Sequence, residues 1–179
     1  MEVPISTLSL HGWADIAQFV IAIAGALALI GAAAQVRLSR TNARRTRVYE
    51  YADRFNESAM MRASADFTTY WATHSYEDYK SLDLVQQLEG RMLPNLIEEI
   101  AFLYNRRLLD RNVAAEILGI YVERLWTVGL PLTLGLRQDR RPDVYAEWEE
   151  MKRDTPRRQR RGVRRAERRR ARRKFFHRG

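Results

Sequence analysis

The sequence predicts an all-α protein, in which an N-terminal transmembrane helix continues into a small cytoplasmic helical bundle with a disordered or partly helical basic C-terminal tail. Three observations lead to this prediction: an uncharged apolar segment of 21 residues, apolar residues repeated every three to four positions through the middle of the chain, and a C-terminus dense in arginine. The expected domains are an extracytoplasmic N-terminus (1–15), the transmembrane helix (16–36), a basic juxtamembrane helix (37–55), a helical bundle domain (56–152) and an arginine-rich tail (153–179).

The apolar segment reads IAQFVIAIAGALALIGAAAQV, residues 16–36, and carries no charge on any face. At ~1.5 Å per residue a helix of this length spans roughly 31 Å, which matches the ~30 Å hydrocarbon core of a bilayer. A buried core helix is one alternative, and a signal peptide cleaved near Ala32 or Ala34 is another. Signal peptides begin with a basic region, whereas only Glu2 and Asp15 are charged here before the segment, so a retained anchor is favoured.

The orientation of the anchor follows from its flanks. Basic side chains are absent before the segment and frequent after it, and such residues stay on the cytoplasmic side of a membrane. The N-terminus is therefore expected outside and the rest of the chain in the cytoplasm. The residues expected at the membrane surface are Trp13, Arg37, Arg40, Arg44, Arg45 and Arg47. Small residues share one face of the segment and offer a route to self-association: Gly25, Ala28 and Ala32.

The membrane helix is expected to run on into the body, because residues 37–55 contain neither proline nor glycine. Apolar side chains recur along it at three to four residues and predict a stripe that faces the bundle: Val48, Tyr51 (or Ala52) and Phe55. Asn56 or Ser58 would cap the next helix, which is expected to reach about Thr73. The pattern SYED, which begins at Ser75, is a capping box and predicts a short helix.

The stretch LDLVQQLEGRML (82–93) is expected to be helical, with an interruption near Gly90 and Pro94. The segment that follows, PNLIEEIAFLYNRRLLD, places its apolar residues on one side of a helix: Leu93, Ile97, Ile100, Leu103 (or Tyr104) and Leu108. Asp110 is expected to cap a single helix over RNVAAEILGIYVERLW, whose inward residues would be Val113, Ile117, Ile120, Tyr121 and Leu125.

The segment GLPLTLGLR carries leucine at every second position, as a strand would. An isolated strand would lack a pairing partner among helices, so we expect an irregular helix. Pro142 suits the first turn of a last helix over PDVYAEWEEM. Three side chains of that helix would close the core: Val144, Trp148 and Met151.

Three stretches together carry a family resemblance: RTRVYEYADRFNE after the anchor, LIEEIAFLYNRRLLDRNVAAEILGIYVERLW in the body, and DVYAEWEEM after it. With the preceding anchor they resemble an uncharacterised bacterial family of short, single-pass, membrane-anchored helical proteins, a domain of unknown function. The resemblance covers roughly residues 15–152 and implies an inner (plasma) membrane protein of a bacterial cell. It rests on packing and capping residues, so it implies a fold and no catalytic residue.

Composition argues against most enzyme chemistry. The chain has no cysteine and three histidines, and it contains none of the glycine-rich phosphate loops or the nucleophile elbow. The carboxylates that could bind two metal ions on bundle helices are Asp66, Glu98, Glu99 and Glu123. None of the histidines follows a glutamate by three residues, as the histidines of di-iron bundles do. We therefore expect no catalytic residue, no cofactor, no metal site and no small-molecule substrate.

The charge of the chain is divided unevenly. Residues 152–179 carry fifteen basic and two acidic side chains, whereas residues 48–151 carry eleven basic and eighteen acidic ones. The tail is therefore the polyanion-binding candidate, through Arg157, Arg158, Arg160, Arg161, Arg164, Arg165, Arg168, Arg169, Arg170, Arg172, Arg173 and Lys174. Anionic lipid, nucleic acid and an acidic protein surface, including the chain's own acidic body, are open as its targets. A solubilising tail without a fixed target is the remaining alternative.

These observations favour a non-enzymatic membrane protein whose helical domain mediates protein interaction or assembly, with its tail on the anionic membrane surface. The partners expected are the lipid bilayer and an unknown protein or a second copy. Two alternatives stay open: a membrane tether that binds nucleic acid through the tail, and a membrane-associated enzyme with an unrecognised site.

Overall fold

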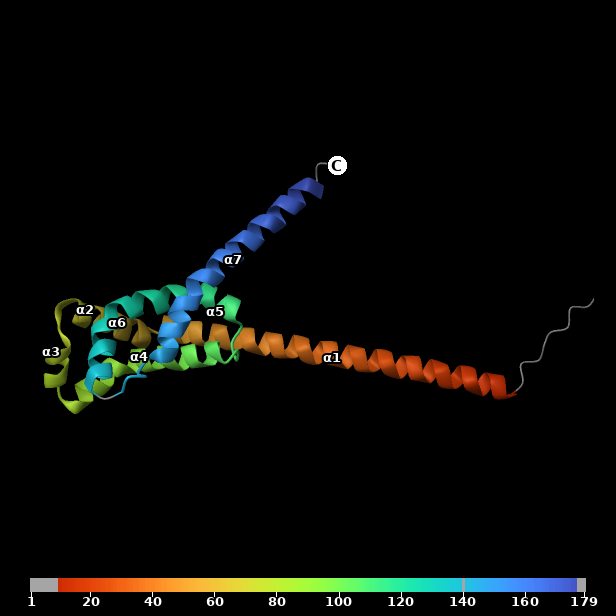
Figure 1. The fold of residues 1–179 in the computed structure, drawn as a ribbon, viewed down its shortest axis with the longest axis horizontal. Coiled ribbons are helices and arrows are strands. Elements are labelled where there is room, and N and C mark those ends of the chain that lie inside the picture. The colour runs from red at the N-terminus through yellow and green to blue at the C-terminus, as the bar shows by residue number, and fades with distance from the viewer. Residues whose placement is uncertain (1–9, 140, 177–179) are drawn as a thin grey trace, which may run out of the picture. The chain divides into compact units, whose positions relative to one another are not determined.

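A computed structural model describes residues 10–139 and 141–176 of the chain, and it describes the side chains of residues 17–139, 141–164 and 167. These residues form seven helices: α1 (Leu10–Asn56), α2 (Ser58–Thr73), α3 (Tyr76–Ser81), α4 (Leu84–Asn105), α5 (Arg111–Ile117), α6 (Gly119–Asp139) and α7 (Ala146–Phe176) (Figure 1). No strand occurs in the described part of the chain, so the all-α prediction is confirmed. The chain divides into two compact units, Met1–Asn42 and Ala43–Gly179, and we call the second unit the body.

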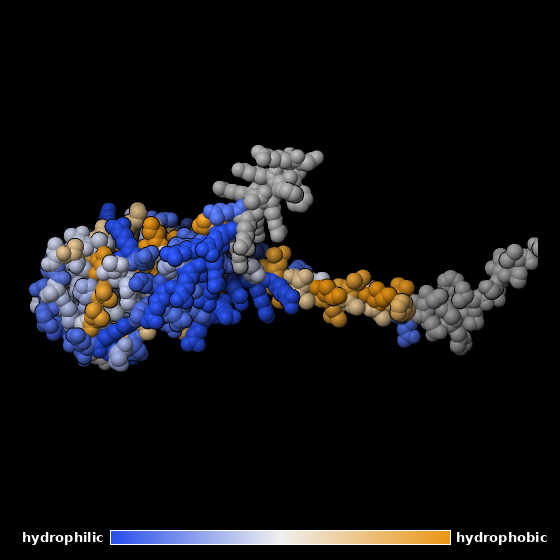
Figure 2. Space-filling model, turned by 45° about the horizontal axis from the view of Figure 1, so that its top comes forward, coloured by the Kyte–Doolittle hydropathy of each residue, from blue (hydrophilic) through white to orange (hydrophobic). Residues whose placement is uncertain are grey.

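The first unit contains the apolar part of α1. Residues 17–42 are exposed along their whole length, and hydrophobic side chains cover the face of this helix that Figure 2 shows. The most apolar 18-residue window of the described helix has a mean hydropathy of 2.3 and none of it is buried. By length and composition α1 can therefore cross a membrane. Its exposure argues against the alternative of a buried core helix, because a core helix would have neighbours to pack against.

The core of the body is built from the end of α1 and from α2, α3, α4, α5, α6 and α7. The expected apolar stripe of α1 is confirmed at its two ends, because Val48 and Phe55 are buried. Helix α7 lies against α4, α5 and α6 and brings its expected core residues Trp148 and Met151 inside. The largest side chains with almost no exposure come from four helices and two of the connecting segments: Tyr79, Leu93, Ile97, Ile100, Tyr104, Leu109, Leu118, Leu125, Leu132 and Trp148.

Side-chain caps begin three of the helices. Ser75 and Asp78 form the expected capping box at the start of α3, and Asp110 accepts from the backbone of Asn112 and Val113 at the start of α5, as expected. A second capping box, formed by Asp83 and Gln86, opens α4 and was not expected from the sequence. At the start of α2 the N-cap residue is Glu57, without a side-chain hydrogen bond, rather than Asn56 or Ser58.

One expected break is absent, and one break occurs where a continuous helix was expected. Helix α4 continues through Gly90 and Pro94 without interruption, because Pro94 is buried in the core and packing there offsets a cost of about 3 kcal/mol for proline in a helix. The segment 111–126, expected to be one helix, instead bends by 63° between α5 and α6. At the bend a Cβ on Gly119 would lie 2.5 Å from Thr155 of α7, so the break lets α6 begin in close contact with α7.

Other expectations about α6 and α7 are corrected in part. The segment GLPLTLGLR is helical, as expected, and belongs to α6, which passes through Pro131. Pro142 lies in a turn, and α7 begins only at Ala146, after Tyr145 with its positive φ of 57°. Two residues expected inside are exposed, Leu108 and Ile120, and Leu109 is buried in place of Leu108.

A substitution at Gly135 tests the contact between α3 and α6. A Cβ at this position would lie 2.1 Å from the ring of Tyr76, so Gly135→Ala is expected to lower the free energy of unfolding by about 1–3 kcal/mol. The control is Gly162→Ala in α7, where nothing lies within 4 Å and alanine should be neutral or stabilising by about 0.5–1 kcal/mol. Thermal unfolding of the full chain measures both, and equal shifts would contradict the close contact.

Candidate interaction surface

A groove of 560 Å³ lies between α2 and α4, and we call it the α2–α4 groove. Three aromatic residues form its base, namely Phe67 and Trp71 of α2 and Tyr79 of α3, which are buried and pack ring against ring. Small residues keep it open: Ala59 and Ala63 on α2, and Gly90 on α4. Its lining is completed by Arg62, Asp66, Tyr70, Leu82, Gln86, Glu89, Met92 and Leu93. The groove is therefore apolar inside, with charged residues among its lining.

Tyr70 is the polar residue of the groove that lacks a partner. Its ring stacks on His74 at a centroid distance of 4.3 Å, and its hydroxyl is buried without a hydrogen bond to any described group. Burial raises the pKa of this hydroxyl, and the nearby charge of Asp78 acts in the same direction. Tyr70 therefore stays neutral at physiological pH and contributes an apolar ring to the wall of the groove.

Beside the groove, helix α4 presents a row of apolar side chains to solvent, which we call the α4 ridge. Leu84, Val85, Leu88 and Met92 are 71%, 63%, 59% and 50% exposed. Leu84, Leu88 and Met92 follow one another at four-residue spacing, so they lie on one face of the helix. Met92 belongs to both the ridge and the groove, which makes the two features one continuous apolar surface. Met61 on α2 adds a further exposed apolar side chain.

The chain around this surface is acidic. Residues 56–90 contain six carboxylates and two basic side chains, so their net charge of −4 is more than half of the net −7 of residues 48–151. Asp66 and Glu89 are exposed and line the groove, and no ion pair joins either of them to a basic group within the described residues. The groove is therefore apolar inside, and its charged lining residues are two carboxylates, Asp66 and Glu89, and one guanidinium, that of Arg62.

At the start of the basic segment of α7, one carboxylate gathers three partners, and we call this group the Asp154 cluster. Asp154 accepts from the hydroxyl of Tyr104 and the guanidinium of Arg111, both at 2.7 Å, and it also pairs with Arg158. Burial alone would raise the pKa of Asp154, but the hydrogen bonds from Arg158 and Tyr104 and the charges of both arginines hold this pKa below its ordinary value. The cluster fastens α7 to α4 and α5.

The lowered pKa of Asp154 predicts a loss of stability in acid. The Asp154 carboxyl has a lower pKa in the folded state than in the unfolded state. Its contribution to the free energy of unfolding is therefore complete above about pH 4 and is lost as the pH falls through the folded-state pKa. Asp154→Asn should therefore lower the thermal midpoint of the full chain at pH 7 and make that midpoint less sensitive to acidification between pH 5 and 3. An unchanged pH dependence in Asp154→Asn would show that other carboxylates account for it.

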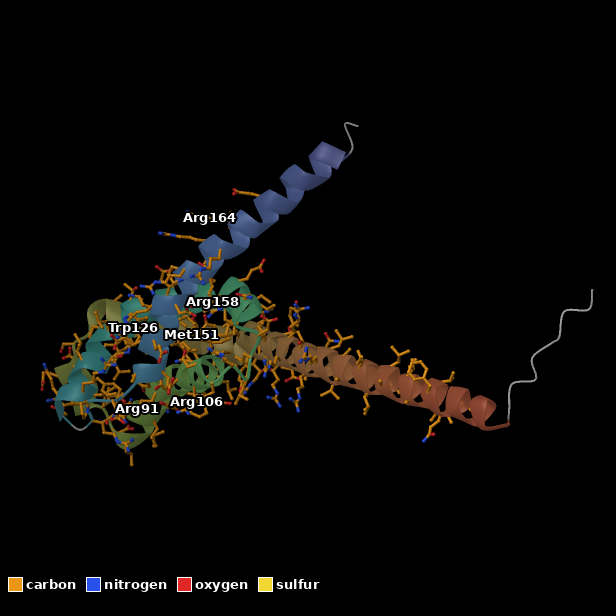
Figure 3. The ribbon with its side chains drawn as sticks, turned by 45° about the vertical axis from the view of Figure 1, so that its right-hand side comes forward. Arg91, Arg106, Trp126, Met151, Arg158 and Arg164 are labelled. Atoms are coloured by element: carbon orange, nitrogen blue, oxygen red, sulfur yellow. The ribbon has the colours of Figure 1, made fainter. Side chains whose placement is uncertain are left out.

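The predicted polyanion-binding residues divide into groups in the structure. Arg157, Arg160, Arg161 and Arg164 are exposed on α7, whereas Arg158 is used in the Asp154 cluster (Figure 3). Packing of α7 on the body extends beyond residue 152, because the side chain of Gln159 donates to the carbonyl of Ala115 at 2.9 Å. The remaining residues lie outside the described side chains: Arg165, Arg168, Arg169, Arg170, Arg172, Arg173 and Lys174.

The predicted membrane-surface residues also differ in their surroundings. Arg37, Arg40, Arg44 and Arg47 are exposed on α1, and the side chain of Trp13 lies outside the described side chains. Arg45 donates to Asp110 at 2.9 Å. Burial would raise the pKa of Asp110, but this bond and the backbone donors at the start of α5 hold it lower. Arg45 thus fastens α1 to α5 within the body.

Two of the four carboxylates considered as metal ligands, Glu98 and Glu99, accept hydrogen bonds from other helices. Glu98 accepts from the backbone N–H groups of Glu147 and Trp148 at 3.2 and 2.8 Å, which caps the start of α7 from α4. Glu99 accepts from the hydroxyl of Tyr51 at 2.5 Å, and burial together with this bond raises the pKa of Tyr51 to about 12. Within the described residues no group of three or more His, Asp or Glu is placed to hold a metal ion.

The sequence did not point to the α2–α4 groove or the α4 ridge as a site. The signals in the sequence were the apolar residues Leu84, Val85 and Leu88 in a stretch expected to be helical, and the aromatic residues Tyr70 and Trp71, which could line a ligand pocket but are more often core residues. In comparisons with known proteins, residues 19–155 match a family described as "Domain of unknown function (DUF4760)". No curated protein and no solved structure matches the chain.

Proposed function

We propose a function for this chain, which belongs to the DUF4760 family of domains of unknown function. The chain is a non-enzymatic, single-pass membrane protein whose helical body mediates protein interaction or assembly. The observation that carries the proposal is the α4 ridge beside the α2–α4 groove. Contiguous apolar surface on a folded domain is characteristic of interaction sites, because leaving it in water is unfavourable. Helix α1 supplies the anchor.

The anchor is proposed to lie in the inner (plasma) membrane of a bacterial cell, with the N-terminus outside and the body in the cytoplasm. The support is the distribution of arginine, which follows the apolar segment and does not precede it. A reporter fused after Gly179 should therefore behave as cytoplasmic in intact cells. In spheroplasts, cleavage of residues 48–151 by external protease would contradict this orientation.

The tail is proposed to contact the anionic surface of the same membrane. Its support is the exposure of Arg157, Arg160, Arg161 and Arg164, together with the anchor, which keeps the tail close to lipid. The same exposed guanidinium groups suit phosphates of a nucleic acid, and a membrane tether for nucleic acid is the second candidate function.

Co-purification tests the interaction proposal. The full chain is extracted in a mild uncharged detergent, as wild type and as the double variant Leu84→Gln and Leu88→Gln, which removes apolar surface without adding charge. The matched control is Ile120→Gln with Leu134→Gln, two exposed residues of α6. A defined protein, or a second copy of the chain, should accompany the wild type and the control and be lost from the ridge variant.

Two results would contradict the proposal. Co-purification that is equal in all three proteins would show that the ridge has no part in it. Material that is released by nuclease and depends on the tail would support the nucleic-acid tether instead.

A further inference from the structure

We propose that the α2–α4 groove binds the basic C-terminal segment, residues 162–176, of a second copy of this chain. This inference rests on the proposed interaction function and names its partner. It starts from the groove, whose base is apolar and whose charged lining residues are Arg62 and Asp66 on α2 and Glu89 on α4.

The charge of the groove surface decides between possible occupants. The groove lining carries Asp66 and Glu89 against Arg62, and residues 56–90, which supply most of it, contain six carboxylates against two basic groups. The net negative charge of this segment disfavours anionic lipid and nucleic acid. It also repels the same face of a second copy, so a symmetric contact of two α4 ridges would bring two net negative surfaces together. A fitting occupant is basic and also carries apolar groups.

The C-terminal segment meets both requirements. Residues 162–176 contain eight basic side chains against Glu167, and they end in Phe175 and Phe176. Arginine also brings its own apolar surface, because its aliphatic stem can cover apolar groups while the guanidinium reaches a carboxylate or an aromatic face. In the groove such stems would cover Met92 and the α4 ridge, with guanidinium groups at Asp66 and Glu89. This is helix-in-groove recognition with charged edges.

The occupant is assigned to a second copy because α7 runs in the wrong direction to fill the groove of its own chain. Trp148 at the start of α7 contacts Glu98, Asp154 contacts Tyr104 farther along α4, and Gln159 reaches α5. The groove residues of α4, from Gln86 to Leu93, precede Glu98 and lie toward the opposite end of that helix. A second copy anchored in the same membrane avoids this obstacle, and the shared anchor raises its effective concentration.

Disulfide cross-linking between copies tests the assignment, because the natural chain contains no cysteine. One population of the full chain carries Ala59→Cys at the groove, and another carries Ala171→Cys in the tail. They are mixed in an uncharged detergent, which removes anionic lipid as a competitor, and then oxidised. A mixed disulfide-linked dimer should form in clear excess over a control in which Thr127→Cys, exposed on α6, replaces the groove cysteine.

Charge reversal provides the second part of the test. Adding Asp66→Arg and Glu89→Arg to the groove population should reduce the mixed dimer about threefold to tenfold, as expected for the loss of two exposed ion pairs and their replacement by repulsion. Glu116→Arg with Glu123→Arg, which reverses two exposed carboxylates on α5 and α6, should leave the dimer unchanged.

The inference is wrong if the mixed dimer does not exceed the Thr127→Cys control, or if groove reversal has no effect. It is also wrong if a chain that carries both cysteines links only within itself. If cross-linking fails while the ridge variant still loses a co-purifying protein, the groove serves that other protein. The interaction function then stands, and only the assignment of the second copy fails.

Discussion

Trp148→Ala is expected to remove about 3–5 kcal/mol from the free energy of unfolding of the body, which is a large part of the 5–15 kcal/mol that stabilises a typical domain. The Trp148 side chain is 1% exposed, and its rings meet those of Trp126 and Tyr145 edge to face at 5.3 and 5.9 Å. Its indole N–H also donates to the carbonyl of Val122 at 3.0 Å. Alanine would leave a cavity where α4, α6 and α7 meet.

Near-ultraviolet circular dichroism of the full chain during denaturation measures this loss, because the signal reports packed aromatic rings rather than the helix content of the anchor. Trp148→Phe should be less damaging, since it keeps most of the packing and loses the hydrogen bond. Tyr49→Ala removes a ring that is 52% exposed and should have little effect. If Trp148→Ala were no worse than Tyr49→Ala, the position of α7 in the core would be wrong.

Removing residues 162–179 from the full chain is expected to lower its binding to anionic vesicles by at least about a thousandfold at physiological salt. The deletion removes nine basic side chains and Glu167, and each basic group near an anionic surface contributes about 1 kcal/mol before screening. The cut follows Arg161 because Arg158 and Gln159 belong to the packed body. Co-flotation of detergent-extracted protein with vesicles of increasing anionic lipid content measures the change.

A variant with lysine in place of every arginine in residues 162–179 is the matched control, because it keeps the charge. Membrane binding that depends on charge alone should survive this change and weaken as salt is added. RNA binding by the wild type without vesicle binding would overturn the lipid assignment in favour of the nucleic-acid tether. Binding to neither would make the tail a solubilising segment.

Local patterns in the sequence predicted most of the helices. The capping box at Ser75 and the N-cap at Asp110 depend on hydrogen bonds to residues two or three positions away. They can therefore be predicted from the local sequence. The exposed apolar segment of α1 was predicted from composition alone, because its length and lack of charge do not depend on any partner. The buried positions of Ile97, Ile100 and Trp148 followed from helical periodicity.

The candidate site was not predictable in the same way. Leu84 and Leu88 have the same residue type as core leucines, and only the arrangement of the other helices leaves them exposed. Asp154, Tyr104 and Arg111 form one cluster although about fifty residues separate the first two. In the sequence, Arg158 could not be distinguished from the other arginines of the tail. Its ion pair with Asp154 forms part of a cluster that appears only when α7 is packed against α4 and α5.

The sequence by itself determined an apolar helix long enough to cross a membrane, a helical body, helix starts at capping residues, and the separation of a basic tail from an acidic body. These properties follow from composition, from periodicity, or from bonds within a few residues of one another. The tertiary structure decided that α4 passes through Pro94, that the chain bends between Ile117 and Gly119, and that a groove opens beside an exposed ridge on α4. Those outcomes depend on packing between helices distant in sequence, whose energies exceed the local preferences of about 1–3 kcal/mol that a sequence pattern records.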